Sequence, residues 1–283
     1  MASANPTLRQ RQLATRLREL RHGSGLSIAE VAGALLCSPA KISRIETAQR
    51  RVSLRDVRDL CRLYRVENSS ELMALAKDAR EQGWWQDGED VDFRPVPGLE
   101  NDAIRISEYE TTTIPGLLQT EEYAQAVIHG SLPQIDPIVL QERVAYRMKR
   151  QDVLRKKQPP RYWVLLDESA LHRHIGGLQV MAEQLEKVVH MAGEPHITVQ
   201  VVPFKVGAHM ALDSAFMLLE FDPSAGVADT VYMDTLAGQI FQEKPAQLAR
   251  FREVLNQLRA VALSPRDSIA LIRERIAAFQ AES

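Results

Sequence analysis

Apolar residues recur at helical spacing through the first 80 residues of the chain. Leu13, Leu17 and Leu20 lie at i, i+4 and i+7, which places one apolar stripe on a helix expected from about Thr7 to Arg21. The same period continues in four further segments, so five helices are expected in this part of the chain. The four begin after Ser27, at Pro39 (ending near Ala48), after Ser53 and at Ser70. The pattern predicts a compact all-α domain over residues 1–80.

Two of these helices carry start signals that fix their register. Ser27 stands three residues before Glu30, the spacing of a capping box in which each side chain satisfies the other residue's backbone N–H. Ser38 precedes Pro39, and proline suits the first helical position because no helical hydrogen bond is lost there. With Ile42 and Ile45 in the core, the exposed face of this third helix is small, polar and cationic, and it comprises Pro39, Ala40, Ser43, Arg44 and Thr47.

Beyond residue 80 the helical period breaks. Residues 81–98 contain Trp84, Trp85 and several Gly and Pro, and are predicted to be a connector. We expect the two tryptophans to pack onto a domain, the alternative being an exposed pair that binds a partner.

Residues 99–283 combine helical segments with short β-branched and aromatic runs, which predicts an α+β domain with a small sheet attached to a mostly α-helical chain. Helices are expected at Glu100–Tyr109, from Thr120 to about His129, and at Pro137–Lys157, Gly177–Met191, Pro245–Ala262 and Pro265–Gln280. Four strands are expected at Tyr162–Leu166, Ile197–Val202, Ala215–Phe221 and Val227–Met233.

Charge divides the chain in the same place. Residues 1–80 hold 15 Lys and Arg against 8 Asp and Glu, a net of +7, whereas the rest of the chain has a net of −9. A cationic domain of this size favours a polyanion as its partner, because Lys and Arg that contact phosphates release condensed counterions. The acidic remainder is poorly suited to extended contact with DNA and must serve another purpose.

Neither a membrane nor a metal is indicated by the sequence. The apolar runs are far shorter than the ~20 residues that cross a bilayer, and the first residues do not form an apolar leader, so a cytoplasmic protein is expected. Cys37 and Cys61 lack metal-ligand spacing and are expected to be buried free thiols.

The segments Leu26–Ala32 and Ser38–Glu46 resemble the helix-turn-helix of phage repressors and of the xenobiotic-response-element family of regulators. The resemblance covers about residues 10–65 and implies double-stranded DNA as partner, with the helix from Pro39 in the major groove. By position, Ala40, Ser43 and Arg44 become base-reading candidates. Arg44 is the most informative, because a guanidinium can bond guanine O6 and N7 together.

The same resemblance implies further roles around this helix. Ser27, Lys41, Arg50 and Arg51 look like residues that position the DNA backbone, while Ser38, Pro39 and Thr47 complete the predicted interface. The alternative for Arg50 and Arg51 is a solvated loop. Relatives also pair an Arg that ends the first helix with a Glu late in the third, which implies a structural pair between Arg21 and Glu46.

The remainder resembles the C-terminal domain of actinomycete antitoxin-like regulators, the WhiJ-like group. The resemblance spans about residues 80–265 and is carried by Ile114–Ala124, Gly83-Trp84-Trp85 and Leu166–Leu171. Such proteins are commonly encoded beside a small partner protein and regulate differentiation or antibiotic production. The resemblance therefore implies control by such a partner.

Catalysis finds little support in the sequence. Asp167, Glu168, His172 and His174 are close enough to suggest a metal or hydrolytic site, but two histidines two residues apart diverge on a helix and lack further ligands. The chain also lacks a phosphate-binding loop, a dinucleotide fingerprint and a nucleophile elbow, so we expect neither an enzyme nor a cofactor.

A DNA-binding transcriptional regulator is the function these patterns predict. We expect a homodimer, because a repressor-type domain grips two half-sites roughly 34 Å apart. The input through residues 99–283 is predicted to be a small partner protein, and the alternative is a one-component regulator that senses a small ligand.

Overall fold

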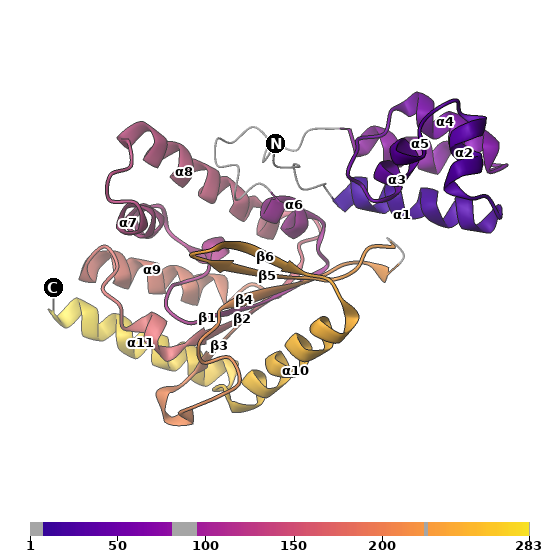
Figure 1. Ribbon diagram of the computed structural model, residues 1–283. Coiled ribbons are helices and arrows are strands. Elements are labelled where there is room, and N and C mark those ends of the chain that lie inside the picture. The colour runs from indigo at the N-terminus through magenta and orange to yellow at the C-terminus, as the bar shows by residue number, and fades with distance from the viewer. Residues whose placement is uncertain (1–7, 81–94, 224–225, 283) are drawn as a thin grey trace. The chain divides into compact units, whose positions relative to one another are not determined.

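The protein is described by a computed structural model that covers residues 8–80, 95–223 and 226–282 (Figure 1). The chain forms two compact units, one made of Met1–Asp102 with Phe221–Ala228 and the other of Ala103–Glu220 with Asp229–Ser283. The predicted connector falls mostly on residues 81–94, so Trp84 and Trp85 lie outside the described residues. The end of that connector is helical, since α6 spans Pro95–Asp102.

Five helices follow one another through residues 8–80, as the apolar period predicts. They are α1 (Leu8–Gly23), α2 (Ile28–Ala34), α3 (Pro39–Glu46), α4 (Leu54–Leu63) and α5 (Ser70–Asp78). The capping box at α2 is complete: Ser27 Oγ accepts from the N–H of Glu30 at 3.2 Å, and Glu30 Oε2 accepts from the N–H of Ser27 at 2.8 Å. Ser38 Oγ caps α3 in the same way, accepting from the N–H of Lys41 at 3.2 Å.

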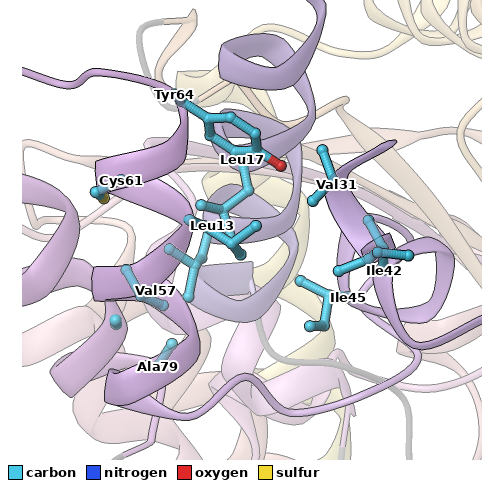
Figure 2. Close-up of a cluster of buried hydrophobic side chains, with 12 residues drawn as sticks. Leu13, Leu17, Val31, Ile42, Ile45, Val57, Cys61, Tyr64 and Ala79 are labelled. Carbon is cyan, nitrogen blue, oxygen red and sulfur yellow. The ribbon is translucent and has the colours of Figure 1, made fainter. Parts of the chain in front are cut away.

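One hydrophobic core joins all five helices (Figure 2). Leu13 and Leu17 from α1 are fully buried and meet Ile42 and Ile45 of α3, which fixes the face that α3 leaves in solvent. Cys61 is buried in this core as a free thiol. Burial of a Leu or Ile side chain contributes about 1.5–3 kcal/mol, so this core is the main source of stability of the helical domain.

The second unit contains a six-stranded sheet in the order β3-β2-β1-β4-β5-β6, counted over the described residues. Its strands are β1 (Arg105–Glu110), β2 (Arg161–Asp167), β3 (Ile197–Val202), β4 (Phe216–Glu220), β5 (Thr230–Thr235) and β6 (Gly238–Gln242). Strands β1, β2 and β3 are parallel, with Tyr109 opposite Leu165, and β4 to β6 continue as an antiparallel meander.

Helices cover the sheet and connect its parallel strands. They are α7 (Glu121–Ser131), α8 (Pro137–Arg150), α9 (Leu178–Met191), α10 (Pro245–Val261) and α11 (Pro265–Glu282). Helix α10 packs Leu255 and Leu258 onto the face that carries Tyr109 and Leu165. Helices α9 and α11 lie side by side in the same unit (Figure 1). The α+β architecture expected from the mixed pattern is confirmed.

Three expectations about local structure are wrong. Glu100–Tyr109 is not a helix, because the chain leaves α6 at Asp102 and enters β1. The sheet has two strands more than predicted, β1 and β6. The predicted helix Pro137–Lys157 ends at Arg150 and continues as a 3-10 turn, η3, over Gln151–Arg155. Strand β1 is buried on both faces in the middle of the sheet, so its residues lack the alternation that reveals a half-exposed strand.

The segment Ile114–Ala124 is a hub for the helices of the second unit. Tyr123 Oη accepts from the N–H of Ile114 at 3.1 Å, and Gln119 Nε2 donates to the Ile114 carbonyl at 2.7 Å. Gln151 Nε2 and Lys187 Nζ both donate to the Gln119 carbonyl, at 2.7 and 2.6 Å. Hydrogen bonds, most of them buried, thus connect this loop to α7, η3 and α9. The segment Ile114–Ala124 therefore has a structural role.

Gln184 forms the hydrogen bonds between α9 and this segment whose loss should be the simplest to measure. It is fully buried on α9, donating to the carbonyl of Leu118 at 2.8 Å and accepting from the N–H of Thr120 at 2.7 Å. We expect Gln184→Ala to lower the free energy of unfolding of this unit by about 2 kcal/mol, since both backbone groups lose their partner. Urea unfolding should show this loss, and Gln179→Ala, on the exposed side of the same helix, should change little. Equal stability of the two variants would contradict a stabilising role for the hydrogen bonds between Gln184 and the segment Ile114–Ala124.

Candidate nucleic-acid interface

Helix α3 presents a polar, cationic face to solvent. Pro39, Ala40, Arg44 and Thr47 are exposed and Ser43 is half-buried, whereas Ile42 and Ile45 are buried on the other side. The guanidinium of Arg44 projects from this face, and the structure records no hydrogen bond or ion pair for it within the described residues. A guanidinium in this state can bond to a nucleic acid without first breaking a contact inside the protein.

The hydroxyl groups of the predicted interface are already used by the helices. Ser27 Oγ donates to Glu30 Oε2 at 2.7 Å, and Thr47 Oγ1 donates to the carbonyl of Ser43 at 2.9 Å. Ser27 and Ser38 are exposed at the starts of α2 and α3, so the hydroxyls hold the two helix starts in place. The backbone N–H of Ser27 also donates to Glu30 Oε2, so the start of α3 is better suited to a phosphate than the start of α2.

Lys41 is engaged in an ion pair within the domain. Its Nζ lies 2.6 Å from Oδ1 of Asp56, and both side chains are about three-quarters buried. Burial opposes ionisation of Asp56, but the hydrogen bonds from Lys41 and Ser53 outweigh it and lower the pKa of Asp56. Lys41 therefore ties α3 to α4, a contact that its place in the sequence did not predict.

The chain after α3 brings two arginines onto the same exposed segment. The N–H of Arg50 donates to the carbonyl of Arg44 at 3.0 Å, which turns the backbone tightly at Ala48, a residue with φ of 56°. Arg50 and Arg51 are both exposed on this turn. With Arg44 they form what we call the arginine segment, defined by Arg44, Arg50 and Arg51.

A buried ion pair fixes the orientation of α3. Arg21 Nε lies 2.7 Å from Glu46 Oε1, and Arg21 Nη2 lies 2.9 Å from Glu46 Oε2, the two-pronged geometry that a guanidinium makes with a carboxylate. Arg21 Nη1 also donates to the carbonyl of Leu26 at 2.9 Å. The hydrogen bond that Arg21 donates to Glu46 raises the pKa of Arg21. One side chain thus joins α1, the loop before α2 and the end of α3.

Leu36, at the turn between α2 and α3, is an exposed residue that the apolar period does not predict. Its side chain is 95% exposed and its φ of 49° lies in the left-handed region that favours glycine. The structure therefore places an exposed apolar side chain beside the first turn of α3. A lone apolar residue in a turn was the one signal in the sequence that could have marked it.

The residues considered for a metal or hydrolytic site point in different directions. His172 Nε2 lies 3.5 Å from Glu168 Oε1, but the ring of His174 packs edge-on against Phe279. Over residues 8–80, 95–223 and 226–282, no group of three or more His, Cys, Asp and Glu side chains is arranged to hold a metal ion. Within the same residues, no helix has the length and apolar character needed to cross a membrane.

Two family models match the chain, each over a different part of it. Residues 12–75 match the helix-turn-helix domain, the DNA-binding domain of many regulators, and residues 93–274 match a domain of unknown function, DUF5753. Curated proteins and solved structures give no significant match. The first match makes residues 12–75 a DNA-binding module. The second covers more than half of the chain, which therefore belongs to the DUF5753 family and carries a helix-turn-helix domain at its N-terminal side.

Proposed function

We propose that the protein is a sequence-specific transcriptional regulator that reads DNA with the exposed face of α3. The observation that carries the proposal is the arginine segment beside a polar helix face, held in place by the buried pair of Arg21 and Glu46. Arg44 reads a base edge, whereas Arg50, Arg51 and the starts of α2 and α3 contact phosphates. The net charge of +7 over residues 1–80 supplies the non-specific part of the affinity. The protein acts in the cytoplasm, without catalysis.

Arg44→Ala tests the base-reading assignment. We expect it to weaken binding to the preferred duplex by about 1–3 kcal/mol and to relax the preference at one base pair, with a much smaller loss on random DNA. The preferred sequence is first enriched from randomised duplexes with the full chain, and affinities are then measured by fluorescence anisotropy at one salt concentration.

Arg55→Ala is the matched control for that experiment. Arg55 is 84% exposed on α4 and pairs only loosely with Asp59, at 3.7 Å, so its removal changes the net charge equally without removing a base contact. An equal loss on preferred and random DNA for Arg44→Ala would move Arg44 to the phosphate-contacting class. No loss on either would refute the assignment of α3.

The proposal includes a homodimer on DNA. A single α3 reads only one half-site, and two copies related by a two-fold axis read half-sites roughly 34 Å apart. Sedimentation should show dimers on the selected duplex. Monomers both free in solution and on DNA would overturn this part of the proposal and leave the α3 assignment intact.

The second unit is proposed to be the input domain, controlled in an antitoxin-like manner by a small partner protein encoded nearby. Support comes from the net charge of −9 over residues 81–283 and from the resemblance of Ile114–Ala124 to WhiJ-like regulators. Co-expression with the product of an adjacent small gene should give a stable complex with altered affinity for the selected duplex. Unchanged affinity in the presence of that product would contradict partner control.

Ligand sensing is the second candidate for the input, and one observation favours it. An open cleft of about 460 Å³ lies in the second unit, at the carboxyl ends of the parallel strands of the sheet. Ligand pockets commonly have volumes of about 300–1,000 Å³, so the cleft has room for a small molecule.

A further inference from the structure

The cleft is built by the loops that leave three parallel strands. Thr111 follows β1, Asp167 ends β2, and Pro203 follows β3, so the carboxyl ends of all three strands meet at it. Open sheets with parallel strands commonly bind ligands at the carboxyl ends of the strands. The binding crevice lies where the strand order reverses, because the loops on the two sides diverge there. In this sheet the reversal is at β1, which pairs with β2 on one side and with the antiparallel β4 on the other.

Two of the lining residues, Asp167 and His209, belong to a hydrogen-bonded array of titratable side chains behind the surface of the cleft. The hydroxyl of Tyr109, which is fully buried, lies 3.5 Å from Asp167 Oδ2 and 3.3 Å from His209 Nε2. His209 Nδ1 accepts from the N–H of Ala211 at 3.3 Å, so in the neutral ring the proton is on Nε2, which donates to the Tyr109 oxygen. Asp167 Oδ1 accepts from the N–H of Ser169 at 2.9 Å. The array holds the Asp167 carboxylate in a fixed orientation at the cleft.

The charge of the lining selects a cation. Among the ten described residues that line the cleft there are two carboxylates, Asp167 and Asp213, and neither Lys nor Arg. The Asp167 side chain is 16% exposed, so its carboxylate is desolvated enough to strengthen an ion pair and still reachable. Phe204 and Leu212, each 56% exposed, add apolar surface at the same cleft.

We propose that this cleft binds a small organic amine, with its ammonium group on Asp167 and its apolar body against Phe204 and Leu212. Phe204 lines the same cleft as Asp167, and an aromatic ring there can add attraction for the ammonium through its π face. A metal ion is the weaker candidate, because the described residues offer no cluster of three ligating side chains. The amine would be the ligand of the ligand-sensing function proposed above. Binding of the amine in the cleft does not depend on that function, but any effect of the amine on DNA binding does.

The test uses the full-length protein and three probes that differ in one group: 2-phenylethylamine, 2-phenylethanol and 3-phenylpropionate. We expect saturation-transfer NMR to show binding of the amine in the millimolar range and at least about tenfold weaker binding of the alcohol and the acid. Asp167→Asn should weaken binding of the amine by about tenfold while keeping an oxygen for the N–H of Ser169. Phe204→Ala should weaken it by a smaller factor.

Asp152→Asn is the control, since Asp152 is 66% exposed in η3 and is absent from the cleft lining. Equal binding of amine and alcohol, unchanged binding by Asp167→Asn, or lack of amine binding at about 10 mM would each overturn the inference. The assay contains no DNA, so its failure leaves the assignment of α3 standing. Failure of the Arg44→Ala experiment likewise leaves the cleft assignment standing.

Discussion

Replacing Glu46 with alanine is expected to lower the free energy of unfolding of the helix-turn-helix domain by about 3–5 kcal/mol. Arg21 is 7% exposed and loses both of its hydrogen bonds to Glu46 in this variant, so a charge remains buried without its counter-charge. A small domain is stable by about 5–15 kcal/mol in total, so a measurable fraction of molecules would have this domain unfolded. The affinity for DNA should fall as the folded fraction of the domain falls, and α3 also loses the contact that orients it.

Two further variants test whether the unpaired buried charge causes this loss of stability. Glu19→Ala removes the exposed pair with Arg16, whose side chains are both more than half exposed, and should cost under about 1 kcal/mol. The double change Arg21→Met with Glu46→Leu removes both charges and should recover most of the stability, because the main cost is the unpaired buried charge.

Amide hydrogen exchange of peptides from residues 8–80 reports the loss locally in the full chain. Protection equal to wild type in Glu46→Ala would contradict a stabilising role for the pair.

The helix-turn-helix domain was predictable because its signals are local. Ser27 with Glu30, and Ser38 with Pro39, fix two helix starts within four residues of sequence, and the apolar period then determines the buried face. Lys41 shows the limit of this approach. Its partner, Asp56, lies 15 residues away on α4, and only packing of α3 against α4 brings the two together.

The second unit was less predictable because its organisation depends on distant pairings. Strand β1 is defined by β2 and β4, which are more than 50 and more than 100 residues further along the chain. The cleft was missed for the same reason, since Tyr109, Asp167 and His209 are brought together only by the order of the strands. The sequence pattern groups Asp167 with Glu168, His172 and His174, whereas in the structure His209 lies beside it, with Nε2 3.8 Å from Asp167 Oδ2.

Raising the pH from 4.5 to 8 is expected to destabilise the second unit through Glu110. Burial and the neighbouring Glu108 raise the pKa of Glu110 to about 8, and Asp234 acts in the same direction. The hydrogen bond from Thr113 and the charge of Arg150 oppose the shift without cancelling it. Between the ordinary pKa of 4.5 and about 8 the folded protein therefore holds a proton that the unfolded chain releases. This contribution to stability is complete below 4.5, falls through that window and is gone above 8.

Glu110→Gln isolates this contribution, since the amide resembles the protonated carboxyl group and does not titrate. Each unit of pKa shift corresponds to about 1.4 kcal/mol, so the variant should be more stable than wild type by about 4 kcal/mol at pH 8 and nearly equal to it at pH 4.5. Calorimetric unfolding across this range measures the difference, with Glu253→Gln on the exposed side of α10 as the control that keeps the wild-type pH profile. A pH profile of Glu110→Gln parallel to that of wild type would show that Glu110 is ionised in the folded protein. The proton would then belong to one of the neighbouring carboxyl groups, Glu108 or Asp234.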